Sequence, residues 1–222
     1  MASVLADHSE IRAVYTVSGN TPQTRGDITE QSAQTFLKGT PIMLNSGNLK
    51  VWDATVTIPA TATVGIAGIT LANGSNLASS GLGAPGGGGV GNLTGVKPPG
   101  TSLTFGKIPF QASAINIIPG SPVSDGRTLL EIANADTVFE GQFDDNGGVP
   151  ATATTNKNMI GKQFGLTLDA TGHWFVDAAK VTVGGGQNVV LTIVDLNPLD
   201  GAIQNGRVYF KFLLGICQLA QA

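Results

Sequence analysis

The sequence predicts an all-β protein with an antiparallel barrel or sandwich core, an extended N-terminal arm and a long Gly-rich loop. Short apolar stretches rich in Val, Ile, Thr and Phe recur between turns of Gly, Pro, Asn and Asp. Helical periodicity is nearly absent over the 222 residues. This length is enough for one large domain or two small ones, and for a hydrophobic core.

The expected strands follow one another along most of the chain. In order, they lie at 11–17, 41–45, 49–53, 64–71, 113–118, 128–133, 137–143, 163–168, 173–177, 188–195 and 207–214. A short helix is expected around 29–39, and a single helical turn at 156–161.

The first of two clear hairpins spans residues 162–177, "KQFGLTLDATGHWFVD". One face is expected to carry Phe164, Leu166, Leu168, Trp174 and Val176. The turn is "DATG", where the side chain of Asp169 can accept backbone hydrogen bonds and Gly172 can take a positive φ. This alternation predicts half-buried strands.

The second hairpin combines "NVVLTIVDL" with "RVYFKFLL". The inward positions are expected to be Val189, Leu191, Ile193, Val208, Phe210, Phe212 and Leu214. Arg207, Tyr209 and Lys211 alternate with them on the second strand and are expected to face outward. The last hundred residues or so therefore resemble one compact barrel.

The first third of the chain differs in character. Residues 18–35 are polar and show no apolar periodicity, so they are expected to be disordered or to fold on a partner. We therefore divide the chain into an extended arm at 1–35, a β-rich region at 36–120 with its Gly-rich loop at 72–107, and a compact C-terminal barrel at 121–222. One barrel with extensions and two separate domains both remain open.

Composition narrows the classes of partner. Charged residues make up 12% of the chain, about half of the usual 25%. A surface covered by partners or copies explains this shortage, and so does an all-β surface of Thr, Ser, Asn and Gly. The net charge is −3 and the cations are scattered singly, so no nucleic-acid partner is expected. No apolar run reaches membrane-spanning length, and Asp7, His8 and Glu10 argue against a signal peptide.

Two motif matches are attributed to composition. Gly81, Gly83 and Gly86 match G-x-G-x-x-G, but Gly86 is the first of four consecutive glycines where a phosphate-binding helix would begin, so no cofactor is expected. "FDDNGG" at 143–148 has calcium-loop offsets, yet Thr155 stands where the bidentate Glu belongs. That stretch is expected to be a hairpin turn and no metal is expected.

Residues with catalytic chemistry do not form a recognisable set. His8 is expected in a mobile terminus, and His173 is expected half-exposed beside a hairpin turn. Asp144 and Asp145 are adjacent carboxylates in a turn, expected to face water. Cys217 lies in the apolar tail "GICQLA" and is expected to be a small buried hydrophobe. We therefore predict no catalytic residues and no enzyme activity.

Several stretches together resemble a known family. They are "TFLKGTPIMLNSGNLKVWD", "GIAGITLANGSNLASSG", "GRTLLEIANADTVFEGQFDD", "IGKQFGLTLDATGHWFVD" and "NGRVYFKFL". In order and character they are similar to the capsid decoration, or cement, proteins of tailed bacteriophage heads. The resemblance extends over most of the chain from about residue 35 onward.

The resemblance implies a structural role at the virion. A decoration protein forms a β-rich homotrimer on the outer surface of the capsid, is made in the host cytoplasm, and bridges adjacent subunits of the major capsid protein. The arm at 1–35 would order on contact, so deletion of residues 1–30 is expected to leave a folded barrel that no longer decorates heads. The alternative is a receptor- or glycan-binding module of a head or tail fibre, for which two Trp and two Tyr offer few aromatic platforms.

Overall fold

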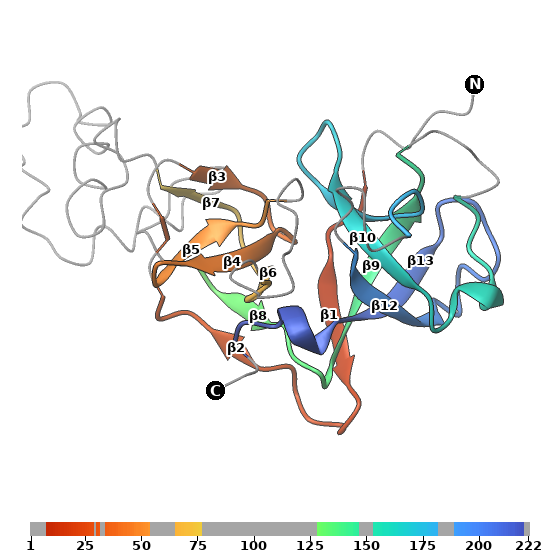
Figure 1. The fold of residues 1–222 in the computed structure, drawn as a ribbon, viewed down its shortest axis with the longest axis horizontal. Helices are drawn as coiled ribbons and strands as arrows, with labels where there is room; N and C mark the ends of the chain where they lie inside the picture. Colours follow the sequence, from red (N-terminus) through yellow and green to blue (C-terminus); the bar gives the residue numbers. More distant parts are fainter. Residues whose placement is uncertain are drawn as a thin grey trace, which may run out of the picture.

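The computed structural model describes residues 8–28, 30–31, 34–53, 65–76, 128–146, 153–181 and 189–219. Within these ranges the regular elements are β-strands and two short 3-10 turns, which confirms the predicted all-β class. Figure 1 shows a barrel on one side and a second, smaller sheet on the other.

Five strands form the barrel: β9 (Thr137–Asp144), β10 (Gln163–Leu168), β11 (Trp174–Asp177), β12 (Val189–Leu196) and β13 (Arg207–Phe212). Their order is β9-β11-β10-β12-β13, and β13 pairs back with β9 to close the ring. Most neighbours are antiparallel, but β9 and β11 are parallel, with Phe143 opposite Val176. On this edge of β9, strand β11 pairs with the C-terminal end, and strand β1 (Arg12–Thr16) pairs with the N-terminal half.

The second sheet has the order β2-β8-β6-β4-β5. Its strands are β2 (Thr24–Arg25), β8 (Leu130–Ile132), β6 (Gly68–Thr70), β4 (Pro41–Asn45) and β5 (Asn48–Val51). Beside it, β3 (Gln34–Phe36) and β7 (Gly74–Asn76) form a two-stranded pair. The 3-10 turns are η3 (Lys157–Met159) and η4 (Leu214–Ile216).

A single hydrophobic cluster joins the barrel to the second sheet. Buried barrel residues pack in one cluster with Met43, Ile66 and Ile69, and the rings of Trp52 and Trp174 lie 5.5 Å apart. Because these side chains come from both sheets, the packing that stabilises one also stabilises the other.

The C-terminal segment also connects the two sheets. The backbone N–H of Ile66 donates to the carbonyl of Ile216 at 2.7 Å. The side-chain amide of Gln218 then pairs with the backbone of Leu44, accepting from its N–H at 2.6 Å and donating to its carbonyl at 3.1 Å. Strand β6 pairs only with Pro41 and Ile42 of β4. The Gln218 amide therefore supplies hydrogen-bond partners to the backbone of Leu44, which lies beyond that pairing.

Most predicted strands are confirmed, and those at 41–45 and 163–168 have the observed bounds of β4 and β10. The single turn at 156–161 is confirmed as η3, whereas the strand expected at 113–118 lies outside the described residues. The short helix expected around 29–39 is wrong, because β3 pairs there with β7. The Gln34 side-chain amide donates to the Leu49 carbonyl and accepts from the Val51 N–H, contacts that no local pattern reveals.

Two predicted inward positions are also wrong. Leu168 is 48% exposed, because β10 ends there at the turn into β11. Leu214 is 58% exposed, because β13 ends at Phe212 and Leu214 begins η4. The remaining inward positions named for the two hairpins are buried.

The N-terminal segment is not a separate arm over its described part. Strand β1 pairs with β9, Ile11 is 1% exposed within the main cluster, and β2 pairs with β8. Deletion of residues 1–30 therefore removes the two strands β1 and β2 and a core side chain, so its effect on decoration would not report on an arm alone. The boundary at 120/121 also fails to separate the sheets, since β8 belongs to the second sheet. Non-local pairing, invisible to local periodicity, decides both points. Most of the Gly-rich loop at 72–107 lies outside the described residues.

Candidate functional site

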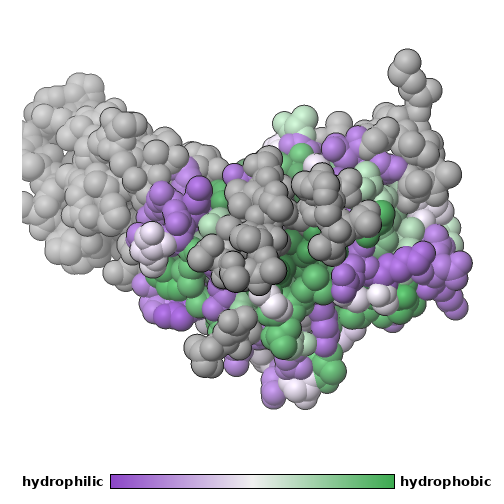
Figure 2. Space-filling model, in the orientation of Figure 1, coloured by the Kyte–Doolittle hydropathy of each residue, from purple (hydrophilic) through white to green (hydrophobic). Residues whose placement is uncertain are grey.

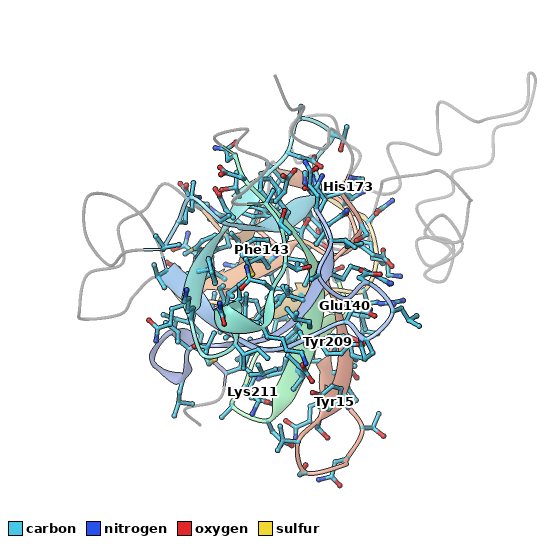
Figure 3. The ribbon with its side chains drawn as sticks, turned by 90° about the vertical axis from the view of Figure 1, so that its right-hand side faces the viewer. Tyr15, Glu140, Phe143, His173, Tyr209 and Lys211 are labelled. Atoms are coloured by element: carbon cyan, nitrogen blue, oxygen red, sulfur yellow. The ribbon has the colours of Figure 1, made fainter. Side chains whose placement is uncertain are left out.

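The outer face of β1, β9 and β13 carries the aromatic and basic side chains expected of a binding surface. Phe139 and Phe210 face the core and lie opposite each other, so the alternating positions on both strands face outward. We call this surface the tyrosine face; it consists of Arg12, Tyr15, Val138, Glu140, Arg207, Tyr209 and Lys211. Figure 3 shows Tyr15, Glu140, Tyr209 and Lys211 on the same side of the barrel.

Two tyrosines from different strands meet on this face. The rings of Tyr15 and Tyr209 are perpendicular, with centroids 6.1 Å apart. Tyr15 lies opposite Val138 in the strand register, and Val138 is completely buried although it points away from the core. Tyr15 itself remains 41% exposed. Burial, and then the neighbouring Glu140 carboxylate, raise the pKa of Tyr209, so its hydroxyl remains a hydrogen-bond donor at neutral pH.

Glu140 organises the charged part of the tyrosine face. It is 4% exposed, and its Oε2 accepts from Nε and Nη2 of Arg12 at 2.9 and 2.7 Å. Its Oε1 accepts from Nδ2 of Asn197 and lies 3.5 Å from Nη1 of Arg207. A buried carboxylate needs such partners, because an unpaired charge there would be costly.

Arg207 is held on its other side by Asp200. The Nε–Oδ2 and Nη2–Oδ1 distances are 2.8 and 3.0 Å, a bidentate pair. The hydrogen bond to Arg207 lowers the pKa of Asp200, and the same bond raises the pKa of Arg207. Both guanidinium groups are therefore fixed in place, while 56% of the Arg12 side chain and 30% of that of Arg207 remain exposed.

Large apolar side chains are exposed at ten of the described positions. They are Val14, Tyr15, Val17, Leu129, Ile160, Leu168, Val181, Leu199, Ile203 and Leu214. Three of them, Val14, Tyr15 and Val17, lie on β1 or directly after it. Figure 2 shows such hydrophobic residues at the surface between the grey atoms and along the lower edge of the view. Apolar side chains gathered on one strand are typical of an interaction surface.

A buried polar cluster holds the segment around His8 against the barrel. Nδ1 of His8 lies within hydrogen-bonding distance of Oδ2 of Asp169, at 2.8 Å, and Nε2 lies 3.0 Å from Oδ2 of Asp144. Its ring stacks on Phe175 with a centroid distance of 4.2 Å. We call these four residues the His8 cluster. Both ring nitrogens of His8 therefore contact carboxylates, one at the end of β9 and one in the turn between β10 and β11.

Asp169 belongs at once to the His8 cluster and to the "DATG" turn. Burial acts to raise its pKa, but hydrogen bonds from His8, from the His173 N–H and from Thr171 outweigh burial and lower it. Its Oδ1 accepts from the backbone N–H groups of Thr171 and His173 at 2.8 and 2.9 Å. Gly172 has a φ of +96°. The predicted capping by Asp169 and positive φ of Gly172 are therefore confirmed.

The structure corrects two expectations at this cluster. His8 is not mobile: its side chain is 0% exposed, wedged between two carboxylates. Asp144 and Asp145 do not face water, being 2% and 4% exposed, since the His8 ring covers Asp144 and the Asp145 N–H donates to Oδ1 of Asp144. The contacts of His8 span 136 and 161 residues of chain, so no local signal could have revealed them.

The other candidate residues lie away from the tyrosine face or outside the described ranges. His173 adjoins the His8 cluster, because its backbone N–H donates to Oδ1 of Asp169 at 2.9 Å. His173 is half-buried beside Trp174, as expected. Cys217 is a free, fully buried thiol, as expected, and burial raises its pKa to about 11. The glycine motif at 81–86 and Gly148 of the calcium-like stretch lie outside the described residues. Across the described ranges, no group of three or more His, Cys, Asp or Glu side chains could hold a metal ion.

Sequence reasoning found the tyrosine face only in part. Alternation in β13 predicted that Arg207, Tyr209 and Lys211 face outward, and these side chains are half-buried on the outer side. The pairing of β1 with β9 brings Arg12 and Tyr15 to the same face, and nothing local indicates that pairing. The alternation in β13 was therefore the signal by which the sequence indicated part of this face.

Comparisons with protein-family models, curated proteins and solved structures gave no match to the chain. Among the residues that the structure describes, no helix is both long enough and apolar enough to cross a membrane.

Proposed function

We propose that the chain is a non-enzymatic virion structural protein that decorates a phage capsid. As a homotrimer on the outer surface, it would bridge adjacent subunits of the major capsid protein and so stabilise the head. The family resemblance of the sequence motivates the proposal, and the tyrosine face is the observation that carries it.

Three properties of the tyrosine face support a protein partner. Tyrosine and arginine are enriched among the residues that dominate binding energy at protein interfaces. The pairs with Glu140 and Asp200 fix Arg12 and Arg207 before any partner arrives, which reduces the entropy lost on binding. Tyr15 is 41% exposed, so part of its side chain is available to a partner.

The proposed mechanism is stabilisation by binding. A protein that binds the assembled shell, and not its free subunits, shifts the equilibrium toward the assembled shell. Each copy needs only a modest contact, because a trimer that engages several subunits at once gains from the effective concentration of its second and third contacts.

Counting and locating the chain in purified virions tests the role directly. A decoration protein is expected at a copy number of the same order as the major capsid protein and spread over the head in electron microscopy. A few copies at one vertex or on the tail would instead support the fibre alternative. For glycan binding by a fibre, only the tyrosines of the described residues offer exposed rings, since Trp52 and Trp174 are 1% and 3% exposed.

Substitution on the tyrosine face tests the surface. We expect Tyr15→Ala and Tyr209→Ala to weaken binding to particles stripped of the protein by about 30-fold or more each, because central aromatic residues at interfaces contribute about 2 kcal/mol or more. Val181→Ala is the matched control, as Val181 is an exposed apolar residue that follows β11, away from this face. Binding is measured by cosedimentation, and folding by thermal unfolding. Folded variants that bind as tightly as the parent would exclude the tyrosine face as the contact.

A further inference from the structure

The connection between β12 and β13 presents an exposed leucine on a rigid turn. Leu199 is 88% exposed. Its backbone N–H donates to Oδ1 of Asn197 at 2.9 Å, and the carbonyl of Asn197 accepts from the N–H groups of Asp200 and Gly201, both at 3.1 Å. We call residues 197–201 the Leu199 turn. Its hydrogen bonds fix the position of the leucine before binding, which lowers the entropic cost of burying it.

An apolar pocket of about 150 Å³ lies elsewhere on the molecule, where the turn between β10 and β11 meets the second sheet. We call it the Trp174 pocket; it is lined by Phe36, Leu37, Thr40, Val51, Leu168, Gly172 and Trp174. An apolar cavity of this size holds a molecule such as benzene, so it has room for the side chain of one leucine.

The wall of the Trp174 pocket is mostly apolar. Trp174, which is 3% exposed, forms part of it together with Phe36, Val51 and Leu168. A leucine side chain placed against this wall removes apolar surface from water, which is the main favourable term in most protein association.

The two features cannot meet within one copy. The backbone around the Leu199 turn pairs with the far end of the barrel, where the carbonyl of Ile203 accepts from the N–H of Thr155 at 2.9 Å, close to η3. In Figure 1 this connection lies at the right-hand edge of the barrel, away from the second sheet that forms one wall of the pocket.

We propose that copies of this chain bind head to tail, with Leu199 of one copy inserted in the Trp174 pocket of the next. Two different surfaces meet in such a contact, so repetition closes a ring if the rotation between copies allows it. The contact rests on the homotrimer of the proposed function and gives it a definite interface. The Leu199 turn adjoins the tyrosine face, because its Asn197 and Asp200 bind Glu140 and Arg207 of that face, so the contact between copies and the contact with the capsid would lie side by side.

The test uses the purified full chain without capsids, so its outcome is independent of capsid binding. We expect Leu199→Asp and Leu168→Asp each to weaken self-association by about 30-fold or more in sedimentation velocity, since each places a carboxylate in the apolar contact. Leu214→Asp is the matched control, because Leu214 is 58% exposed and lies outside both features. It is expected to assemble as the parent does, and thermal unfolding verifies that all three variants fold.

A mixing experiment separates this contact from a symmetric one. The Leu199→Asp variant keeps an intact pocket and the Leu168→Asp variant keeps an intact leucine. Their mixture is expected to form a two-chain complex and nothing larger, because only one productive contact can form. Trp174 emission is expected to shift on mixing. A monomeric parent at all concentrations, assembly of Leu199→Asp at parental strength, or a mixture that stays monomeric would each overturn the proposal.

Discussion

Replacing His8 by alanine is expected to destabilise the folded protein by about 3–5 kcal/mol, because two buried carboxylates each lose a hydrogen-bond partner, at about 1–3 kcal/mol each. The side chains of His8, Asp144 and Asp169 are 0%, 3% and 3% exposed. Without the imidazole, two carboxylates remain buried and each loses its hydrogen bond of 2.8 or 3.0 Å. Loss of the stacking contact with Phe175, worth about 0.5–1.5 kcal/mol, acts in the same direction.

This change is large compared with the total stability of a domain, about 5–15 kcal/mol. For a chain of this size, each kcal/mol lowers the melting temperature by about 2–4 °C. The expected decrease is therefore about 6–20 °C. A decrease of that size is easily resolved by differential scanning calorimetry, and urea unfolding at 25 °C gives the free energy directly.

The matched control is Ser9→Ala. Ser9 is the next residue, is exposed, and contacts Gln142 through its backbone and hydroxyl. It is expected to change stability by less than about 0.5 kcal/mol. A double-mutant cycle of His8→Ala with Asp144→Asn isolates the pairwise term. If the free energy of unfolding of His8→Ala lies within about 0.5 kcal/mol of that of the parent, the His8 cluster does not stabilise the attachment of this segment to the barrel.

The same cluster predicts a pH dependence with a definite sign. The pKa of Asp169 is lower in the folded protein than its unfolded value of about 3.9. Its contribution is therefore fully present above about pH 4 and is lost as the pH falls through the folded pKa. Asp169→Asn is expected to flatten the acid side of the stability curve, and an unchanged acid limb would contradict the assignment.

Two further predictions concern the C-terminal segment. Burial raises the pKa of Cys217 to about 11, so the thiol should resist alkylation in the native protein at pH 8 and react on unfolding; rapid native labelling would contradict its burial. The neutral thiol favours the fold below its unfolded pKa of about 8.5, and this contribution is lost as the pH rises through 11. Gly65→Ala is expected to cost about 1–3 kcal/mol in urea unfolding, because its Cβ would lie 2.3 Å from the carbonyl oxygen of Ile216. Gly215→Ala, with nothing within 4 Å of the added Cβ, is the control, and equal stability of the two variants would argue against the clash.

The sequence by itself determined the class of the fold and much of its local detail. A short apolar stretch placed β4 and period-two alternation placed β10, and "DATG" predicted both the capping role of Asp169 and the positive φ of Gly172. The burial of Cys217 also followed from its apolar neighbours. These features depend on residues a few positions apart, which a sequence pattern reports directly.

Only the tertiary structure decided which distant segments meet. His8 finds its carboxylates 136 and 161 residues away, and β1 brings Tyr15 to Tyr209 by pairing with β9. In the same way, a leucine predicted to lie inside, Leu168, instead lines an open pocket. The physical reason is that strand pairing and burial are chosen by packing across the whole molecule, while periodicity records only the two faces of each strand.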